Sequence, residues 1–395
     1  MNTSQLIKPD LYYIGASDRR LALFENIMPV PRGVSYNSYV LLDEKTVLLD
    51  SADNAVGEQF LENLDATLAG RPLDYFIIHH VEPDHLALTK EVLLRYPNAQ
   101  VVCSAQAVKF IAQFFDMEMV NQPRIVKEGD TLCTGKHTFT FVAAQMVHWP
   151  EVMVSWLDAD RILFSADAFG KFGALSKCGY FSEEDGDWAC EARRYYFNIC
   201  GKYGLQVQAL LKKVLPLPLD TICPLHGPVL RGDLAPYTGL YDTWSRYGVE
   251  TEGVFVAYAS IHGGTAAAAL KMADILRAKG CPKVAVADLS RDDQAEAVED
   301  AFRYGKVILA ASSYDAGVFQ PMDIFLHHLR DKAWQKRRVG LIENGSWAPS
   351  AGRVMREQLS AMKEMEIVEP TVTLRSRMKD SDLAALEALA DAILA

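Results

Sequence analysis

The sequence predicts an α/β protein of two domains, an αβ sandwich followed by a doubly wound parallel sheet. Its 395 residues exceed what a single average core holds. Before Tyr247, strand-like runs form hairpins and are mixed with helices, whereas strands and helices alternate strictly from Gly253 onward. We therefore expect one domain over residues 1–248, a second over residues 253–395, and a short boundary between them.

The first half contains strands separated by turns. Two apolar runs flank the polar turn Asp43–Lys45, which predicts a hairpin between Asn37 and Ser51. A buried strand is predicted at Tyr75–Ile78 and delivers polar residues to its carboxyl end. Further strands are expected at 99–104, 137–145, 152–159 and 161–166, and helical runs at 88–97 and 191–214. Hairpins mixed with helices favour a sandwich with its helices on the outside.

The second half has five strand–helix units. The predicted strands are 254–260, 283–290, 306–314, 338–345 and 366–376. The predicted helices are Thr265–Lys279, Gln294–Tyr304, Met322–Gln335, Gly352–Met365 and Ser381–Leu394. Right-handed crossovers between such strands predict a parallel sheet with helices on both faces.

Composition excludes several classes of protein. A formal net charge of −11 argues against nucleic-acid binding, which needs a surplus of Lys and Arg. The sequence shows no secretory signal and no apolar run long enough for a bilayer, so we expect a cytoplasmic protein. Its seven cysteines never occur as C-x-x-C, which excludes a zinc ribbon or a rubredoxin-type iron site. Any iron must therefore be held by histidines and carboxylates.

Histidines and carboxylates cluster where predicted strands end. His80, Glu82, Asp84 and His85 alternate within one loop, HHVEPDHL. His148, Asp167 and His226 are expected at the ends of three later strands. A single histidine at a strand end is usually structural, but this concentration of ligand types predicts a metal site. His79 should point to the opposite side from its neighbour and have a structural role.

These seven residues resemble the metal motif of the metallo-β-lactamase fold. Zinc hydrolases of that fold have H-x-H-x-D-H, whereas this sequence has Glu82 at the second position. A carboxylate there makes the site richer in oxygen and favours iron. The same substitution marks the flavodiiron proteins, in which a flavodoxin-like domain follows the lactamase-like one. The resemblance covers essentially the whole chain.

The resemblance implies a ligand set. One iron would be held by His80, Glu82 and His148. The other would be held by Asp84, His85 and His226, with Asp167 bridging the two ions. In some members of the family the histidine at position 85 stands off the metal behind a water, so direct ligation by His85 is left open. Trp149, Tyr195 and Tyr196 would lie beside the metals, with ordinary aromatic packing as the alternative.

Three loops resemble the flavin-binding loops of flavodoxins. Ser260, Ile261, His262, Gly263, Gly264 and Thr265 open a helix after the first strand, in a form suited to a phosphate. Flavodoxins usually have Thr where His262 stands. Two further loops, at the ends of the third and fourth strands, would contact the flavin ring: Ser312, Ser313, Tyr314, Asp315, Ala316 and Gly317, and Asn344, Gly345, Ser346, Trp347 and Ala348. FMN is preferred over FAD, since no G-x-G-x-x-G unit is present.

The resemblance implies a reductase that passes electrons from FMN to a di-iron site and reduces O2 to water, NO to N2O, or both, for detoxification. It also implies a head-to-tail homodimer or a dimer of dimers, which brings the flavin of one subunit beside the irons of the other. The chain ends with the last predicted helix, so we expect a separate electron donor, such as a rubredoxin-like protein or a reduced deazaflavin coenzyme. Which of O2 and NO is preferred stays open.

Two rival functions remain. The first is a zinc hydrolase with an accessory domain, against which Glu82 and the flavin loops both argue. The second is an electron-transfer or sensing flavoprotein with a merely structural metal. Ligands that leave coordination positions open argue against it.

Overall fold

The computed structural model of the chain describes residues 2–116, 122–176 and 179–395. Cys178, one of the seven cysteines, lies outside this part. Backbone contacts divide the chain into two compact units. Unit 1 consists of Met1–Tyr196 and Leu205–Tyr241, and unit 2 of Phe197–Gly204 and Asp242–Ala395. The boundary between functional domains near Tyr247–Gly253 stays a prediction.

Unit 1 contains two large sheets. The strand order of the first is β1-β2-β7-β8-β9-β10-β11. Its strands are β1 (Gln5–Lys8), β2 (Leu11–Tyr13), β7 (Tyr39–Leu42), β8 (Thr46–Leu49), β9 (Tyr75–Ile77), β10 (Gln100–Ser104) and β11 (Arg124–Val126). The predicted hairpin is present, since β7 and β8 pair antiparallel with Tyr39 opposite Leu49. β9 then joins β8 and β10 in parallel.

The second sheet has the order β12-β13-β14-β15-β16-β17. Its strands are β12 (Thr131–Cys133), β13 (Thr138–Ala143), β14 (Met153–Leu157), β15 (Ile162–Phe164), β16 (Thr221–Cys223) and β17 (Leu230–Arg231). Two small ribbons complete the unit: β3 (Ala16–Asp18) with β6 (Val34–Tyr36), and β4 (Leu23–Phe24) with β5 (Met28–Pro29).

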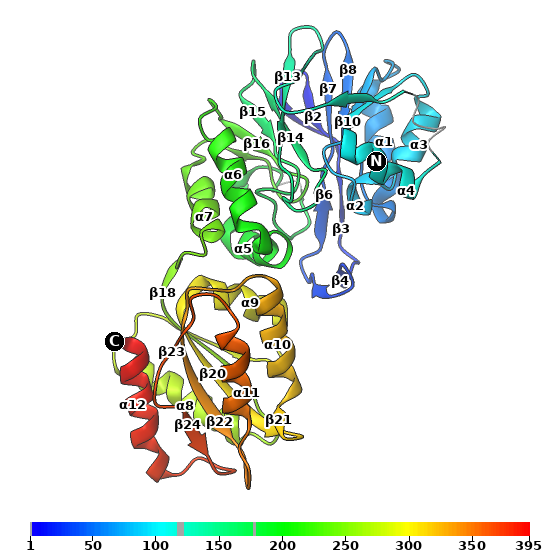
Figure 1. Cartoon of the computed structure of the whole chain (residues 1–395). Coiled ribbons are helices and arrows are strands. Elements are labelled where there is room, and N and C mark those ends of the chain that lie inside the picture. Colours follow the sequence, from blue (N-terminus) through cyan, green and yellow to red (C-terminus); the bar gives the residue numbers. More distant parts are fainter. Residues whose placement is uncertain (1, 117–121, 177–178) are drawn as a thin grey trace. The chain divides into compact units, whose positions relative to one another are not determined.

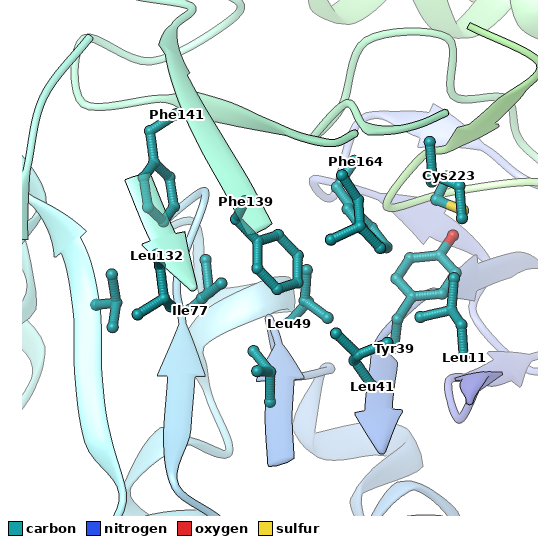
Figure 2. Close-up of a cluster of buried hydrophobic side chains, with 14 of the residues drawn as sticks. Leu11, Tyr39, Leu41, Leu49, Ile77, Leu132, Phe139, Phe141, Phe164 and Cys223 are labelled. Carbon is teal, nitrogen blue, oxygen red and sulfur yellow. The ribbon is translucent and has the colours of Figure 1, made fainter. Parts of the chain in front are cut away.

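The core of unit 1 lies between these two sheets. Leu41, Leu49 and Ile77 of the first sheet pack against Phe139 and Phe164 of the second, as Figure 2 shows. All five side chains are buried. The helices α1 (Gly57–Leu68) and α4 (Ala105–Phe114) pack on β7 and β10 of the first sheet (Figure 1). The predicted αβ sandwich is therefore confirmed.

The helical run predicted at 191–214 is two helices rather than one. α5 (Trp188–Ile199) ends before a 3-10 turn at Gly201–Tyr203, and α6 (Gly204–Val214) follows. Gly204 lies so close to a neighbouring segment that an added Cβ would meet the carbonyl oxygen of Ser245 at 2.4 Å. A glycine permits this close approach at the start of α6.

Unit 2 is a parallel sheet with the order β19-β18-β20-β22-β23, which is the flavodoxin-like order. Its strands are β18 (Thr251–Ala259), β19 (Val284–Asp288), β20 (Tyr304–Tyr314), β22 (Arg338–Asn344), β23 (Glu366–Ile367) and β24 (Val372–Leu374). The prediction of one fifth strand was wrong, because β23 and β24 pair with β22 separately. Pro370 lies between them and has no N–H to donate to a ladder.

Helices cover both faces of this sheet (Figure 1). α8 (Gly264–Ala278) and α12 (Leu383–Leu394) share a buried core with Val256, Ile308 and Ile342 of the strands. On the other face, α9 (Gln294–Arg303), α10 (Gln320–Asp331) and α11 (Ala351–Ser360) pack on the same sheet. None of the described helices combines the length and apolar character needed to cross a bilayer.

A buried carboxylate joins the two sheets of unit 1 at the turn of the β7–β8 hairpin. Asp43 Oδ2 accepts hydrogen bonds from Thr134 Oγ1 at 2.8 Å and from the backbone N–H of His137 at 3.0 Å, and lies 2.9 Å from His137 Nδ1. Its Oδ1 accepts from the N–H groups of Glu44 and Lys136. Burial alone would raise the pKa of Asp43, but these donors outweigh it and hold the pKa well below its usual range.

We predict that Asp43→Asn lowers the free energy of unfolding by about 1.5–3 kcal/mol at neutral pH, because the amide replaces the charged acceptor of several hydrogen bonds. The pKa of Asp43 is lower in the folded state, so its contribution is complete above the unfolded value of about 3.9 and is lost as the pH falls below it. Urea unfolding at pH 7 and at about pH 3 measures both effects. The gap between wild type and variant should narrow at the lower pH, and a gap that stays constant would contradict this role.

Candidate functional site

The seven predicted metal ligands come together in two adjoining groups within unit 1. One group contains His80, Glu82, His148 and Asp167, and the other contains Asp84, His85 and His226. Both groups are supplied by segments that follow strands of the two sheets or connect them. The packed sandwich thereby supports every ligand-bearing segment on a rigid strand.

The local structure around several ligands differs from the prediction. His148 does not end a strand: β13 stops at Ala143, and the histidine lies in the connection to β14. Asp167 follows the end of β15 by three residues, after Ala166 in a left-handed conformation with φ of 50°. Asp84 and His85 lie on the short helix α2 (Pro83–Leu86) rather than in an irregular loop. Pro83 favours this helix, since it suits a first helical turn.

In the first group, two carboxylate oxygens face the same two imidazole nitrogens. Glu82 Oε2 lies 3.3 Å from His80 Nε2 and 3.0 Å from His148 Nε2. Asp167 Oδ2 lies 3.3 Å and 3.1 Å from those nitrogens. The four atoms therefore surround one small volume.

The second group has the same arrangement. Asp84 Oδ2 lies 3.5 Å from His85 Nε2 and 3.3 Å from His226 Nε2, and the two nitrogens are 3.1 Å apart. Asp167 Oδ1 lies 3.2 Å from His85 Nε2 and 3.7 Å from His226 Nε2. His85 Nε2 is thus as close to the other candidate ligands as His226 Nε2 is.

Asp167 connects the two groups through its two oxygens, with Oδ2 toward the first and Oδ1 toward the second. Ligands about 2.1 Å from a common ion are separated from one another by about 3.0–3.4 Å, depending on geometry. Most of the distances above fall in this range. The residues present therefore fit two cations bridged by one carboxylate.

The electrostatics of the site also fit cations. Both carboxylate oxygens of Asp84 and of Asp167 are buried and accept no hydrogen bond within the described part of the chain. Burial alone would lower the pKa of His80, but Asp167, Glu151 and Glu82 outweigh it and raise this pKa well above its usual value. Against the same effect of burial, Asp167 and Glu82 raise the pKa of His148 to about 9.

The pKa shifts of two further ligands have the same origin. Burial would lower the pKa of His85, but the carboxylates of Asp84 and Asp167 raise it. Conversely, burial would raise the pKa of Asp167, but His80, His148 and His85 together hold it well below its usual value. The carboxylates of the site therefore stabilise positive charge on the neighbouring groups, as they would stabilise bound cations.

Hydrogen-bond partners of the Nδ1 atoms fix the orientation of two of the imidazole rings. His80 Nδ1 lies 2.7 Å from Glu151 Oε1, and His226 Nδ1 lies 2.7 Å from the carbonyl oxygen of Ser35. Each contact leaves Nε2 free to bind a metal. Sequence reasoning missed both partners. Glu151 could have been found as the carboxylate three residues after His148, but a backbone carbonyl such as that of Ser35 leaves no signal.

His79 has the structural role that was predicted. Its Nδ1 lies 2.6 Å from Asp50 Oδ2 and its Nε2 lies 2.8 Å from Ser155 Oγ, so both ring nitrogens are occupied within the core. Asp50 Oδ1 also accepts from the N–H of His79 at 2.7 Å and of His80 at 3.4 Å. The end of β8 thus fixes the start of the ligand loop.

The three predicted aromatic neighbours behave differently. The Trp149 ring lies 5.4 Å from that of His80, edge to face, and the Tyr195 ring lies 5.4 Å from that of His226. Tyr196 packs on Tyr241, with ring centroids 5.1 Å apart, and its place beside the metals stays a prediction. Consecutive helical residues point in directions about 100° apart, so the two tyrosines of α5 contact different rings.

Two further aromatic rings contact His226 and were not predicted from the sequence. Phe24 of β4 and Tyr36 of β6 have ring centroids 5.7 Å and 5.8 Å from that of His226. Both are buried. Together with Tyr195, they enclose this imidazole in aromatic side chains and shield it from bulk water.

In unit 2, the predicted cofactor loops meet at the carboxyl ends of β18, β20 and β22. Thr265 Oγ1 lies 2.8 Å from Ser312 Oγ and accepts a hydrogen bond from Asn344 Nδ2 at 3.2 Å, which joins all three loops. A fourth segment, missed in the sequence, contributes Ser376, whose carbonyl oxygen accepts from Asn344 Nδ2. An added Cβ at Gly264 would meet that oxygen at 2.3 Å, so a glycine is required there.

The remaining members of these loops line the same edge. Ser260 Oγ accepts from the N–H of Gly263, at the start of α8. Tyr314 and Trp347 are exposed, Trp347 to 89%, and so are Ile261 and His262. Large aromatic faces that remain exposed beside a loop rich in N–H and hydroxyl donors suit a flat ring carrying a phosphate.

Comparisons with known proteins agree with this geometry. Residues 34–227 match the model of the family described as "ODP family beta lactamase". The anaerobic nitric oxide reductase flavorubredoxin of Salmonella arizonae is 28% identical over 97% of this chain and 80% of its own length. The nitric oxide reductase of Moorella thermoacetica is 27% identical over 97% of this chain and 96% of its own length.

Solved structures share the fold. The flavodiiron protein of Giardia intestinalis has a TM-score of 0.93 at 23% identity, covering 99% of this chain and 96% of its own. Rubredoxin oxygen:oxidoreductase of Desulfovibrio gigas has a TM-score of 0.92 at 24% identity, covering 99% and 98%. The chain is therefore similar in sequence to nitric oxide reductases along nearly its whole length, and it has the fold of the flavodiiron protein structures.

Proposed function

We propose that this chain is an oxidoreductase that reduces NO, O2 or both at a pair of iron ions in unit 1, with electrons supplied by FMN bound to unit 2. The observation that carries the proposal is Asp167, whose two carboxylate oxygens each face a different pair of imidazole nitrogens. A single structural metal needs no such bridge, and Glu82 is the ligand that differs from the motif of the zinc hydrolases. The names of the relatives, a nitric oxide reductase and an oxygen oxidoreductase, support the same chemistry.

Iron would be held by His80, Glu82 and His148 at one position and by Asp84, His85 and His226 at the other, with Asp167 shared. The three carboxylates offset three of the four charges of two divalent ions. A donor set with this many carboxylate oxygens suits iron better than the more imidazole-rich set of the zinc hydrolases does. When bound, the pair supplies electrons to a diatomic ligand.

The protein's own groups position and protect this chemistry. Glu151 and Ser35 orient two of the imidazoles, and the Asp167 carboxylate fixes the separation of the two positions. The rings of Phe24, Tyr36 and Tyr195 exclude water beside His226. A buried site of this kind admits a small neutral molecule more readily than a charged substrate.

FMN would be held in unit 2 by its phosphate and its ring. The residues from Ser260 to Thr265 present N–H and hydroxyl donors at the start of α8, where a helix favours an anion. Tyr314 and Trp347 would contact the ring. The electron donor is proposed to be a separate redox partner, a rubredoxin-like protein or a reduced deazaflavin coenzyme, since no C-x-x-C pair occurs in the 395 residues.

The function is tested by mixing the anaerobically reduced, iron-loaded protein with NO or with O2 in a stopped-flow instrument. Flavin and iron should both reoxidise, with N2O or water as product. The matched variant Glu82→His restores the motif of the zinc hydrolases. It should take up zinc in place of iron and lose reduction of both gases while retaining flavin. A variant with unchanged iron content and full turnover would contradict the role of Glu82.

Thr265→Val tests the flavin site in the full-length chain. Valine removes the hydroxyl that joins the three loops and leaves Ser312 and Asn344 without that partner. FMN binding should weaken by about 1.5–3 kcal/mol, or roughly 10- to 100-fold, as measured by quenching of flavin fluorescence. Thr373→Val is the control, because Thr373 bonds Glu343 outside these loops and should leave affinity unchanged. Equal affinities for the two variants would refute the assignment.

We further propose that the working unit is a head-to-tail homodimer, in which electrons cross between subunits. A chain lacking metal ligands (His148→Ala with Asp167→Ala) and a chain lacking flavin (Gly263→Val with Thr265→Val) should each be inactive alone. Co-expressed mixed dimers should regain activity, because the intact flavin of one chain serves the intact metal site of the other. Inactive mixed dimers, verified by two affinity tags and by circular dichroism, would mean that transfer stays within one chain.

A further inference from the structure

The two proposed metal positions differ in what lies behind their histidines. His80 of the first position has a carboxylate, Glu151 Oε1, at 2.7 Å from its Nδ1. His226 of the second has only a neutral carbonyl oxygen, that of Ser35, at the same distance. His85 Nδ1 is buried and has no hydrogen-bond partner among the described residues.

Glu151 is buried and hydrogen-bonded to neighbouring segments. It is 2% exposed, and its Oε1 also accepts a hydrogen bond from the N–H of Val81 at 3.1 Å. Its backbone carbonyl accepts from Ser104 Oγ at the end of β10. Both contacts tie Glu151, which precedes β14 of the second sheet, to segments of the first sheet, and its burial leaves little water to screen its charge.

A carboxylate behind a coordinating imidazole increases the electron density on the nitrogen that binds the metal. The first position thus has Glu82 as its own anionic ligand, half of Asp167, and Glu151 behind His80. The second has Asp84 and the other half of Asp167 as its anionic ligands. Of the carboxylates that would bind a metal or that contact a ring nitrogen of a ligand histidine, the first position therefore has one more, and this carboxylate acts through a ring rather than by direct ligation.

We propose that Glu151 is a positioning residue that makes the two metal positions inequivalent. Through His80, it makes the first position the tighter of the two and the one that better stabilises a ferric ion. The second position, formed by Asp84, His85 and His226, releases its ion more readily and stays ferrous at higher potential. This inference rests on the proposed function, because it requires that two iron ions occupy the site.

The test compares wild type, Glu151→Gln and Asp43→Asn as iron-loaded, full-length proteins. Glu151→Gln keeps an acceptor oxygen for His80 but removes the charge. Asp43→Asn makes the same change in another buried carboxylate–histidine pair of unit 1, the Asp43–His137 pair, which contains none of the candidate ligands. It therefore controls for loss of stability. The measurements are iron release to a chelator and redox titration followed by Mössbauer spectra.

Wild type should release its two ions in separate phases and show two distinct iron environments at half-reduction. Glu151→Gln should weaken the slowly released ion by about 10- to 100-fold, shift the lower of the two iron potentials upward, and leave the other ion nearly unchanged. Asp43→Asn should match wild type in both measurements. Where Glu151→Gln fails to fold, Glu151→Asp should give a smaller change of the same sign, since it keeps the charge but moves it away from His80.

Failure of the proposed role of Glu151 and failure of the proposed function give different results. A wild type that binds two ions, with release and potentials that neither Glu151 variant alters, overturns the role of Glu151 and leaves the proposed function intact. A wild type that never holds two iron ions overturns the proposed function itself. Equal changes in Glu151→Gln and Asp43→Asn would show that Glu151 only stabilises the fold, which also overturns the inference.

Discussion

The Asp167 carboxylate is the group on which the site depends, because its two oxygens lie within 4 Å of the Nε2 atoms of all four candidate histidine ligands. Its Oδ2 faces His80 and His148, and its Oδ1 faces His85 and His226. These histidines come from segments after β9, between β13 and β14 and after β16, and Asp167 itself follows β15. Both sheets must therefore be packed before the site exists. The apolar core between the sheets sets the spacing of the ligands (Figure 2).

Burial is the second constraint, since it makes the charges of the site strong and their partners obligatory. Asp84 and Asp167 keep oxygens that no hydrogen bond satisfies in the described structure, which costs folding free energy unless cations bind. This loss of folding free energy at the site is offset by favourable interactions elsewhere in the unit. Asp43, for example, satisfies its buried carboxylate fully with donors that join the two sheets. The fully hydrogen-bonded carboxylate of Asp43 thus stabilises the fold, whereas Asp84 and Asp167 keep oxygens that can bind cations.

The parts of the fold and site that follow local rules could be predicted from the sequence. The β7–β8 hairpin, the alternation of unit 2 and the ligand types at strand ends all leave periodic or compositional signals. The split of the fifth strand near Pro370 and the break before Gly204 were missed, because tertiary contacts decide how an apolar run is divided. Ser35 and Ser376 act through backbone carbonyls, which every residue has, so no sequence pattern could reveal them.

The same reasoning explains why a symmetrical ligand list does not make a symmetrical site. The sequence gives each metal position two histidines and one carboxylate of its own, so the two positions look alike. The structure adds a charged partner behind His80, a neutral one behind His226 and none behind the Nδ1 of His85 among the described residues. Electrons arriving one at a time would then meet positions of unequal potential. On the proposed role of Glu151, an ordered reduction of the pair would follow from the partners behind the histidines.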